Sequence, residues 1–246
     1  PPRSTLFPYT TLFRSSIDLG GDDTYRNRAG GWVDIAGGAS LFIDMTGNDR
    51  YERPAADFGQ GFGFAGVGML VDFAGDDTYI ARHHSQGAGM AGVGLLWDED
   101  GNDSYSGHGF VQAAGAFGLG MLIDRLGNDS YDGATLCQGG ATTLGMGGRI
   151  DASGNDTFKL WVTPGKDALG GSPGYGQGGA LSFRAYPWRG KVVAYGGAGL
   201  LLDCMGSDSY TTGGWCDQGG SYIMSLGALV DLAGNEIGRA SCRERV

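Results

Sequence analysis

One short acidic motif recurs along nearly the whole chain and constrains its fold more than any other feature. It consists of an apolar residue, Asp, two free positions, Gly, then Asn, Asp or Ser, then Asp, a free position and an aromatic residue, as in "WDEDGNDSY" from Trp97. The copies begin at Ile17, Ile43, Val71, Trp97, Ile123, Ile150, Leu202 and Val230, and the last is truncated. Their leading aspartates are 26, 28, 26, 26, 27, 52 and 28 residues apart. Such a period is typical of stacked structural repeats.

The segments between these motifs are rich in glycine and begin with glutamine. The chain has 50 Gly in 246 residues, and each Gly in a helix costs about 1 kcal/mol relative to Ala, so helices are disfavoured. The glutamines are Gln60, Gln86, Gln112, Gln138, Gln177 and Gln218. Under the two-residue alternation of a strand, one face of the first segment holds Gly61, Gly63, Ala65, Val67, Met69 and Val71.

These signals predict an all-β fold, a parallel β-solenoid of the β-helix or β-roll kind with about eight coils of 26–28 residues. The small glycine faces should let opposite walls approach closely. Equivalent residues should stack from coil to coil, the aromatic residues as a column of rings and the glutamines as an amide ladder. An alternative is that the segments form the hairpins of an outer-membrane β-barrel. The near-identity of the turns at constant spacing favours stacking.

The two ends differ from the repeat. "TLFPYTTLFRS" from Thr5 matches the translation of a DNA string that resembles a common sequencing adapter, and "EIGRASCRERV" from Glu236 matches the translation of its reverse complement. We therefore expect residues 1–16 and 236–246 to be adapter-derived, and residues 17–235 to be the solenoid domain. On this interpretation the chain is a fragment whose native start is missing.

The acidic corners carry side-chain oxygens that suit a hard cation. Calcium takes six to eight oxygen ligands, a number that three side chains per coil supply only if neighbouring coils share an ion. The candidate ligands are Asp44, Asn48, Asp49, Asp72, Asp76, Asp77, Asp98, Asn102, Asp103, Asp124, Asn128, Asp129, Asp151, Asn155 and Asp156. The alternative is a metal-free ladder, in which Asp and Asn cap backbone N–H groups and tolerate left-handed geometry beside glycine.

The run Gly-Asn-Asp-x-Tyr resembles the second half of the nonapeptide of haemolysin-type (RTX-like) calcium-binding proteins. The closest matches are "LGGDDTY" from Leu19 and "LGNDSYDG" from Leu126. The resemblance implies calcium held between successive coils of a secreted or cell-surface β-roll. It covers about six residues per coil, and it departs from the family because the family's nine-residue repeats are tandem and uninterrupted.

Charge and motif content narrow the function classes. A formal net charge of −10 argues against a nucleic-acid partner, which requires clustered Lys and Arg. No apolar run is long enough for a transmembrane helix. The three histidines, His83, His84 and His108, lie in variable stretches, and the chain has no serine elbow, P-loop or zinc-ligand pair. We therefore expect a non-enzymatic module, a structural stalk or adhesin.

The repeat breaks once, between Asp151 and Asp203, and this predicts an insertion at about 159–202. The insertion is enriched in aromatic and basic residues, and loops on a rigid solenoid often carry function. The candidate ligand-binding residues are Trp161, Arg184, Tyr186 and Trp188. Exposed aromatic faces suit sugar rings, so the expected partners are glycans or other cell-surface components. The alternatives are a carbohydrate-active β-helix enzyme with its cleft here, and a plain surface insertion.

Overall fold

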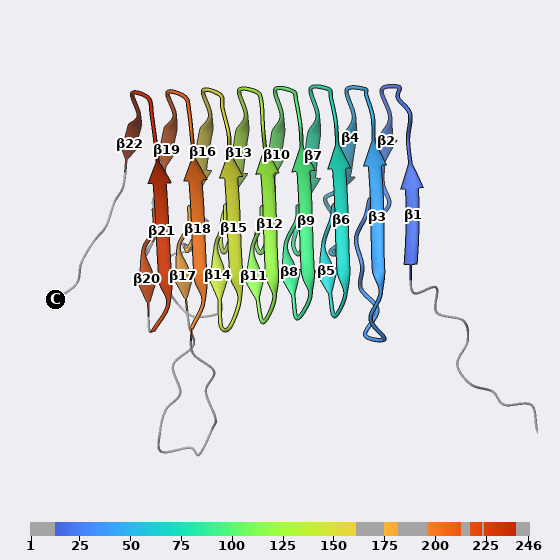
Figure 1. Ribbon diagram of the computed structural model, residues 1–246, viewed down its shortest axis with the longest axis horizontal. Coiled ribbons are helices and arrows are strands. Elements are labelled where there is room, and N and C mark those ends of the chain that lie inside the picture. The colour runs from blue at the N-terminus through green and yellow to red at the C-terminus, as the bar shows by residue number, and fades with distance from the viewer. Residues whose placement is uncertain (1–12, 161–174, 182–195, 213–216, 223, 240–246) are drawn as a thin grey trace, which may run out of the picture.

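The computed structural model describes residues 13–160, 175–181, 196–212, 217–222 and 224–239, which form three parallel sheets and no helix (Figure 1). In order, sheet A contains β1 (Phe13–Ile17), β3 (Ala39–Asp44), β6 (Val67–Asp72), β9 (Val93–Asp98), β12 (Leu119–Asp124), β15 (Met146–Asp151), β18 (Ala198–Asp203) and β21 (Leu226–Asp231). Sheet B contains β2 (Thr24–Tyr25), β4 (Arg50–Arg53), β7 (Thr78–Ala81), β10 (Ser104–Ser106), β13 (Ser130–Gly133), β16 (Thr157–Leu160), β19 (Ser209–Thr211) and β22 (Ile237–Arg239). Sheet C contains β5 (Gly63–Phe64), β8 (Gly89–Met90), β11 (Gly115–Ala116), β14 (Ala141–Thr142), β17 (Ala180–Leu181) and β20 (Ser221–Tyr222).

Each coil passes through sheets A, B and C before it returns to sheet A in the next coil. Equivalent residues pair in register, so Asp72 lies beside Asp98 and Tyr79 beside Tyr105. Six coils contain all three strands, and β1–β2 and β21–β22 form the ends, which makes about seven turns. The predicted parallel β-solenoid is confirmed. The hairpin alternative is wrong, because the strand pairings between described residues are parallel.

The acidic corner joins sheet A to sheet B through five residues in every coil from β3 onward, and through six between β1 and β2. Its glycine is required by contact between successive corners. Gly75 has a φ of 148°, in the region that favours glycine, and a Cβ on it would overlap the carbonyl oxygen of Gly47 in the preceding coil. The corners therefore stack directly on one another along the edge where sheets A and B meet.

The glycine-rich segments allow sheet C to lie directly against sheet A. A Cβ on Gly63 of β5 would overlap the carbonyl oxygen of Val93 in β9, and one on Gly68 of β6 would overlap that of Phe62. The predicted close approach of opposite walls is confirmed.

The predicted alternation over residues 61–71 is wrong beyond Ala65. This residue takes a left-handed φ of 50°, so the chain turns between β5 and β6 and the two halves of the segment face different ways. Gly63 is buried, whereas Val67, Met69 and Val71 face outward in β6 and are half-buried.

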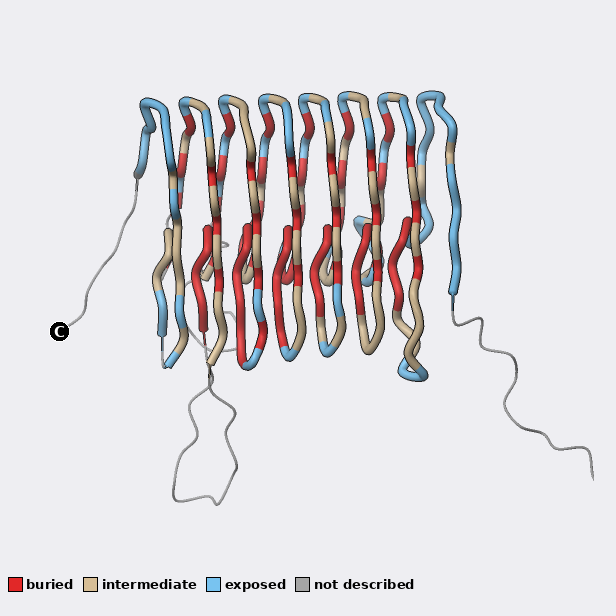
Figure 2. The backbone as a smooth tube through the Cα atoms, viewed as in Figure 1, coloured by how far each residue is buried: buried red, intermediate tan, exposed pale blue. Residues whose placement is uncertain are grey.

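The main core lies between sheets A and B and consists of stacked equivalent side chains. Figure 2 shows that buried residues recur at the same places in successive coils. Sheet A contributes Leu70, Leu96, Leu122 and Leu201, and sheet B contributes Tyr51, Tyr79, Tyr105, Tyr131, Phe158 and Tyr210. From Tyr51 to Tyr210, successive ring centroids are 4.6–5.2 Å apart, with interplanar angles of 1–10°. The predicted aromatic column is confirmed.

Five of the six repeated glutamines, all except Gln218, are buried, and their side chains bond to the backbone rather than to one another. Gln86 Nε2 donates to the carbonyl oxygens of Tyr79 and Ser106, at 3.0 Å each. Equivalent bonds are made by Gln60, Gln112, Gln138 and Gln177. The predicted amide ladder is therefore wrong. Each of these amides donates to backbone carbonyl oxygens and so joins the sheet B strands of two neighbouring coils.

The interval of 52 residues is one coil, since Asp151 pairs with Asp203 and Phe158 with Tyr210. The predicted range 159–202 is too wide, because β17 and most of β18 lie inside it as regular coil. The extra residues fall on both sides of β17, as expected. Trp161, Arg184, Tyr186 and Trp188 lie outside the described residues.

The outermost strands include residues that we assign to the adapter-derived ends. Residues 13–16 belong to β1, which pairs with β3, and residues 237–239 form β22, which pairs with β19. The described part of the chain offers no helix of the length and hydropathy needed to cross a membrane.

Candidate metal centre

Two rows of buried aspartates run along the inside of the acidic corners, and together we call them the inner column. The first row consists of the residue that ends each sheet A strand from β3 to β18, namely Asp44, Asp72, Asp98, Asp124, Asp151 and Asp203. The second row consists of the residue five positions later, namely Asp49, Asp77, Asp103, Asp129, Asp156 and Asp208. Each is at most 2% exposed. Twelve carboxyl groups thus lie in the interior, where Asp is rare unless it is paired.

The first row is hydrogen-bonded to the aromatic column. Tyr105 Oη lies 2.9 Å from Asp98 Oδ2 in its own coil and 3.0 Å from Asp124 Oδ2 in the next. Tyr51 bridges Asp44 and Asp72 in the same way, at 3.0 and 2.7 Å. A phenol has one proton to donate, so it cannot satisfy two ionised carboxylates at once. One carboxyl of each such pair must be protonated or otherwise neutralised.

The second row accepts hydrogen bonds from the backbone. Asp103 Oδ1 accepts the N–H of Asp77 in the preceding coil at 2.6 Å, and Asp129 Oδ1 accepts that of Asp103 at 2.7 Å. The same bond recurs at Asp49, Asp77, Asp156 and Asp208. This row therefore ties each corner to the next.

One oxygen of every aspartate in the inner column is buried without a hydrogen-bond partner. In the first row this atom is Oδ1, and in the second row it is Oδ2. The carboxylates gather in threes, with one ligand atom from each lying within 4.8 Å of the others. The groups include Asp44–Asp49–Asp72, Asp77–Asp98–Asp103, Asp103–Asp124–Asp129, Asp129–Asp151–Asp156 and Asp156–Asp203–Asp208. Such clusters could hold metal ions, and several share a residue with the next.

The electrostatics of the inner column favour added positive charge or protons. Burial raises the pKa of Asp98 well above its ordinary value, and the neighbouring Asp103 and Asp124 raise it further. Burial likewise raises the pKa of Asp203 to about 7. Burying an unpaired carboxylate costs several kcal/mol, so an empty, fully ionised column would oppose folding.

The donor set fits a hard cation. Every ligand atom is a carboxylate oxygen, and two opposite ligands of calcium lie about 4.6–5.2 Å apart when each metal–oxygen distance is 2.3–2.6 Å. Zinc favours nitrogen and sulfur donors, and the inner column contains none. Magnesium usually keeps several waters, which a column this deeply buried accommodates poorly. The clusters are therefore compatible with calcium.

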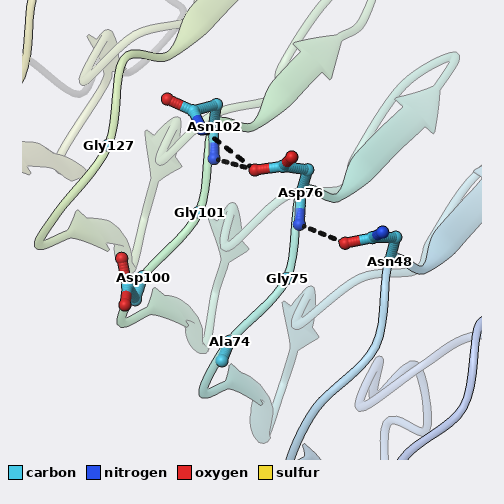
Figure 3. Close-up of a pocket in the computed structure, with 8 residues that line it drawn as sticks. All are labelled: Asn48, Ala74, Gly75, Asp76, Asp100, Gly101, Asn102 and Gly127. Atoms are coloured by element: carbon cyan, nitrogen blue, oxygen red, sulfur yellow. Dashed lines mark hydrogen bonds between the residues drawn. The ribbon is translucent and has the colours of Figure 1, made fainter.

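The middle position of each predicted ligand triplet lies elsewhere, in an exposed outer row of the corner (Figure 3). The outer row contains Asn48, Asp76, Asn102, Asn128 and Asn155. Asp76 N–H donates to Asn48 Oδ1 at 2.8 Å, and Asn102 donates to Asp76 Oδ1 from its backbone at 2.8 Å and from Nδ2 at 3.0 Å. The bonds continue through Asn128 and Asn155. The outer row therefore matches the metal-free ladder, and the inner column matches the metal hypothesis.

One coil breaks the pattern at two positions that contact each other. Arg149 of β15 replaces the core leucine of neighbouring coils, pairing in register with Leu122 and Leu201, and Phe158 replaces the tyrosine. Arg149 is fully buried, and its Nη2 lies 2.6 Å from Asp151 Oδ2. Its guanidinium carbon lies 3.1 Å from the ring centroid of Tyr131 and 4.2 Å from that of Phe158.

The two replacements compensate for each other. Phe158 has no hydroxyl to give Asp151, and Arg149 supplies both a hydrogen bond and a positive charge instead. Burial would lower the pKa of Arg149, but Tyr131, Asp151 and the other acidic groups raise it above its ordinary value. The guanidinium is therefore charged, and the inner column accepts a cation at this coil.

Sequence reasoning missed several of these residues. Asp203 and Asp208 occupy the same two rows as the predicted ligands, and the copy from Leu202 already aligned them. The tyrosine hydroxyls were assigned to stacking alone. Arg149 and Phe158 were detectable as two departures from the repeat within a single coil.

No protein-family model matches this chain, and comparison with curated proteins and with solved structures gave no match either.

Proposed function

We propose that the chain is a non-enzymatic β-solenoid module of a secreted or cell-surface protein, stabilised by calcium in the inner column and acting as a structural stalk or adhesin. The observation that carries this proposal is the imbalance of buried charge. Among the described residues, twelve aspartates of the inner column are buried with one buried cationic side chain, Arg149. Calcium bound between coils would neutralise the remaining coils as Arg149 neutralises its own.

The corner motif supports a secreted or cell-surface location, and the burial of the inner column supports a structural role. The corner motif resembles that of haemolysin-type calcium-binding proteins, and extracellular calcium modules work with dissociation constants of about 10⁻⁴–10⁻³ M. A solenoid that gains its stability from such sites would be rigid where calcium is abundant. The inner column is too deeply buried to touch a substrate, which supports a structural rather than a catalytic role.

Thermal unfolding tests the proposal. The protein is melted in chelator, then in millimolar calcium or magnesium, beside the variant Asp103→Asn with Asp129→Asn. The two amides keep an acceptor for each backbone N–H and remove two negative charges. We expect calcium to raise the melting temperature of the wild type and to raise that of the double variant less, because the variant keeps the clusters Asp44–Asp49–Asp72 and Asp156–Asp203–Asp208 intact. In chelator the double variant should melt at or above the wild type, because its column repels itself less.

The matched control is Asp76→Asn in the exposed outer row, which should respond to calcium as the wild type does. A wild-type melting curve that is indifferent to both chelator and calcium would contradict the proposal. The inner column would then be neutralised by protons shared between carboxyl groups.

Glycan or cell-surface contact through Trp161, Arg184, Tyr186 and Trp188 stays a prediction. Its test is Trp188→Ala, which should reduce binding to a glycan panel without changing the melting temperature. Unchanged glycan binding, or a lowered melting temperature, would contradict it.

A further inference from the structure

The outward face of sheet A is apolar across seven successive strands, from β3 to β21. The first row of this apolar face is Ala39, Val67, Val93, Leu119, Met146, Ala198 and Leu226. The middle row is Leu41, Met69, Leu95, Met121, Gly148, Leu200 and Ala228. The third row is Ile43, Val71, Trp97, Ile123, Ile150, Leu202 and Val230. None of these residues carries a charge.

These side chains reach solvent. All of them are half-buried or exposed, and Met146 and Leu226 are 59% and 67% exposed. The inward positions of the same strands are fully buried in the middle of the stack (Figure 2). An antiparallel or parallel sheet that faces water on one side normally carries polar residues there. The apolar face departs from that pattern in every coil.

The outward face of sheet B shows that the apolar character is specific to sheet A. Its outward positions include Ser104, Ser130 and Thr157, which are exposed, and Lys159. One solenoid thus has a polar wall and an apolar wall built from the same repeat.

The size of the apolar face matches what a stable dimer needs. Seven strands spaced about 4.8 Å apart, each of six residues rising about 3.3 Å, cover about 34 Å by 20 Å, or roughly 700 Å². The largest apolar patch on a typical monomer is about 300–600 Å². Two copies packed face to face would bury about 1,400 Å², within the range of about 1,200–2,000 Å² for stable interfaces.

The regular spacing of the apolar rows makes a second copy of the chain a well-matched partner. In Figure 1 the strands of sheet A run side by side with little twist, so the face is flat. A second copy presents the same three apolar rows at the same strand spacing, and its side chains would fit between those of the first copy along the whole face. Sheets pack in this way at about 10 Å separation. A two-fold contact uses the same patch on both copies.

We propose that sheet A is a dimerisation surface, through which two copies of the chain pack their apolar faces against each other. The centre of the interface is Met121, the middle residue of the middle strand, β12. The inner column and the acidic corner lie outside this interface and are unaffected by it.

The test is the molar mass in solution, measured by sedimentation velocity at about 10 µM. We expect a dimer for the wild type and a monomer for Leu95→Lys with Met121→Lys, which places two half-exposed charges at the centre of each copy's face. The control is Ser104→Lys with Ser130→Lys, the same change on the outward face of sheet B, which should stay dimeric. Circular dichroism checks that both variants keep the β-sheet spectrum.

Two results would overturn the proposal. A wild-type monomer would do so, and sedimentation with phosphatidylcholine vesicles would then identify a lipid surface as the occupant of the face. A Leu95→Lys/Met121→Lys variant that folds and remains dimeric would place the contact on another part of the molecule. If that variant fails to fold, Met121→Gln, which adds no charge, should still weaken the dimer measurably, and an unchanged dimer constant would count against the proposal.

Discussion

The coil that contains Arg149 and the coil that contains Leu96 each bury two aspartates at equivalent positions, but the charge of these aspartates is neutralised differently. In the first, Asp151 is paired with an internal guanidinium and the neighbouring ring is Phe158. In the second, Asp98 is shared between the hydroxyls of Tyr79 and Tyr105, and no cationic side chain is present. The uniform coils are therefore the ones that need a cation or a proton from outside.

The comparison also shows that the fold tolerates positive charge inside the column. Replacing Leu by Arg in a core normally destabilises a protein strongly, because an unpaired buried charge costs several kcal/mol. Here the backbone register is unchanged on both sides of Arg149. The carboxylates around it offset its desolvation, and calcium would use the same electrostatic feature in the other coils.

Calcium removal should separate the two kinds of coil most strongly. In millimolar calcium, a site filled at about ten times its dissociation constant contributes about 1.4 kcal/mol, and 1 kcal/mol shifts the melting temperature by about 2–4 °C in a chain of this size. Three clusters that share no residue thus predict a fall on the order of 10 °C in chelator. Hydrogen exchange should show that amides of β9 and β10 lose protection in chelator before those of β15 and β16. Equal loss of protection in both coils would show that Arg149 does not take the place of calcium in its own coil.

Arg149→Leu should be the most damaging single substitution in the column. It leaves Asp151 buried without its charged partner, which we expect to cost about 3–5 kcal/mol of unfolding free energy. Adding Phe158→Tyr converts the coil to the uniform type and should recover part of the loss, with a stronger dependence on calcium than the wild type shows. Urea unfolding with and without calcium measures both effects. A double variant that is no better than the single one would show that the two positions are not coupled.

The pH dependence of the metal-free protein should run opposite to ordinary acid denaturation. A carboxyl group with a higher pKa in the folded than in the unfolded protein binds protons more tightly when folded, so protons stabilise the fold. That stability is fully present below the unfolded value of about 3.9. It is lost as the pH rises toward the folded value, about 7 at Asp203. We expect the melting temperature in chelator to fall between pH 5 and pH 8, and calcium to remove most of the fall. A chelated protein that becomes more stable over this range would contradict the raised pKa values.

Tyr105→Phe should have the smallest effect of the four. It reproduces in a uniform coil the ring that Phe158 provides naturally, without the compensating arginine. The hydroxyl between Asp98 and Asp124 is lost, and with it one donated hydrogen bond, so we expect a loss of about 1–3 kcal/mol, which urea unfolding would detect. A neutral effect would mean that the hydroxyl is dispensable even where no guanidinium is present.

The fold followed from the sequence because the repeat leaves little freedom. Eight leading aspartates at near-constant spacing can align only if every coil stacks in the same register, and this also places the tyrosines over one another. The site was less accessible. The motif has three polar positions, and the sequence alone does not say which of them turn inward. The backbone geometry of the corner decides this. After Gly75, whose φ is 148°, Asp76 is exposed and Asp77 is buried.

The spacing of the motifs could not predict two other features of the fold. The interval of 52 residues predicted an insertion, but its exact bounds depend on the register between Asp151 and Asp203, which spacing does not reveal. The orientation of the segment from Gly61 to Val71 depends on a left-handed turn at Ala65, an alanine that no composition rule marks as special.

The acidic corner is short in every coil, whereas the connections at the other two edges of the solenoid vary in length, so only those two edges can carry long loops. Seven of the eight corners between sheets A and B contain five residues and the first contains six, whereas the connections from sheet C to sheet A range from two residues after β5 to sixteen after β17. Those from sheet B to sheet C range from seven residues after β7 to nineteen after β16. The chain thus carries long connections at two of its three edges and keeps the acidic edge short. A designer who wishes to graft foreign peptides onto this framework should use a connection from sheet B to sheet C, such as the one after β13, and should expect any graft at the acidic edge to separate the stacked corners.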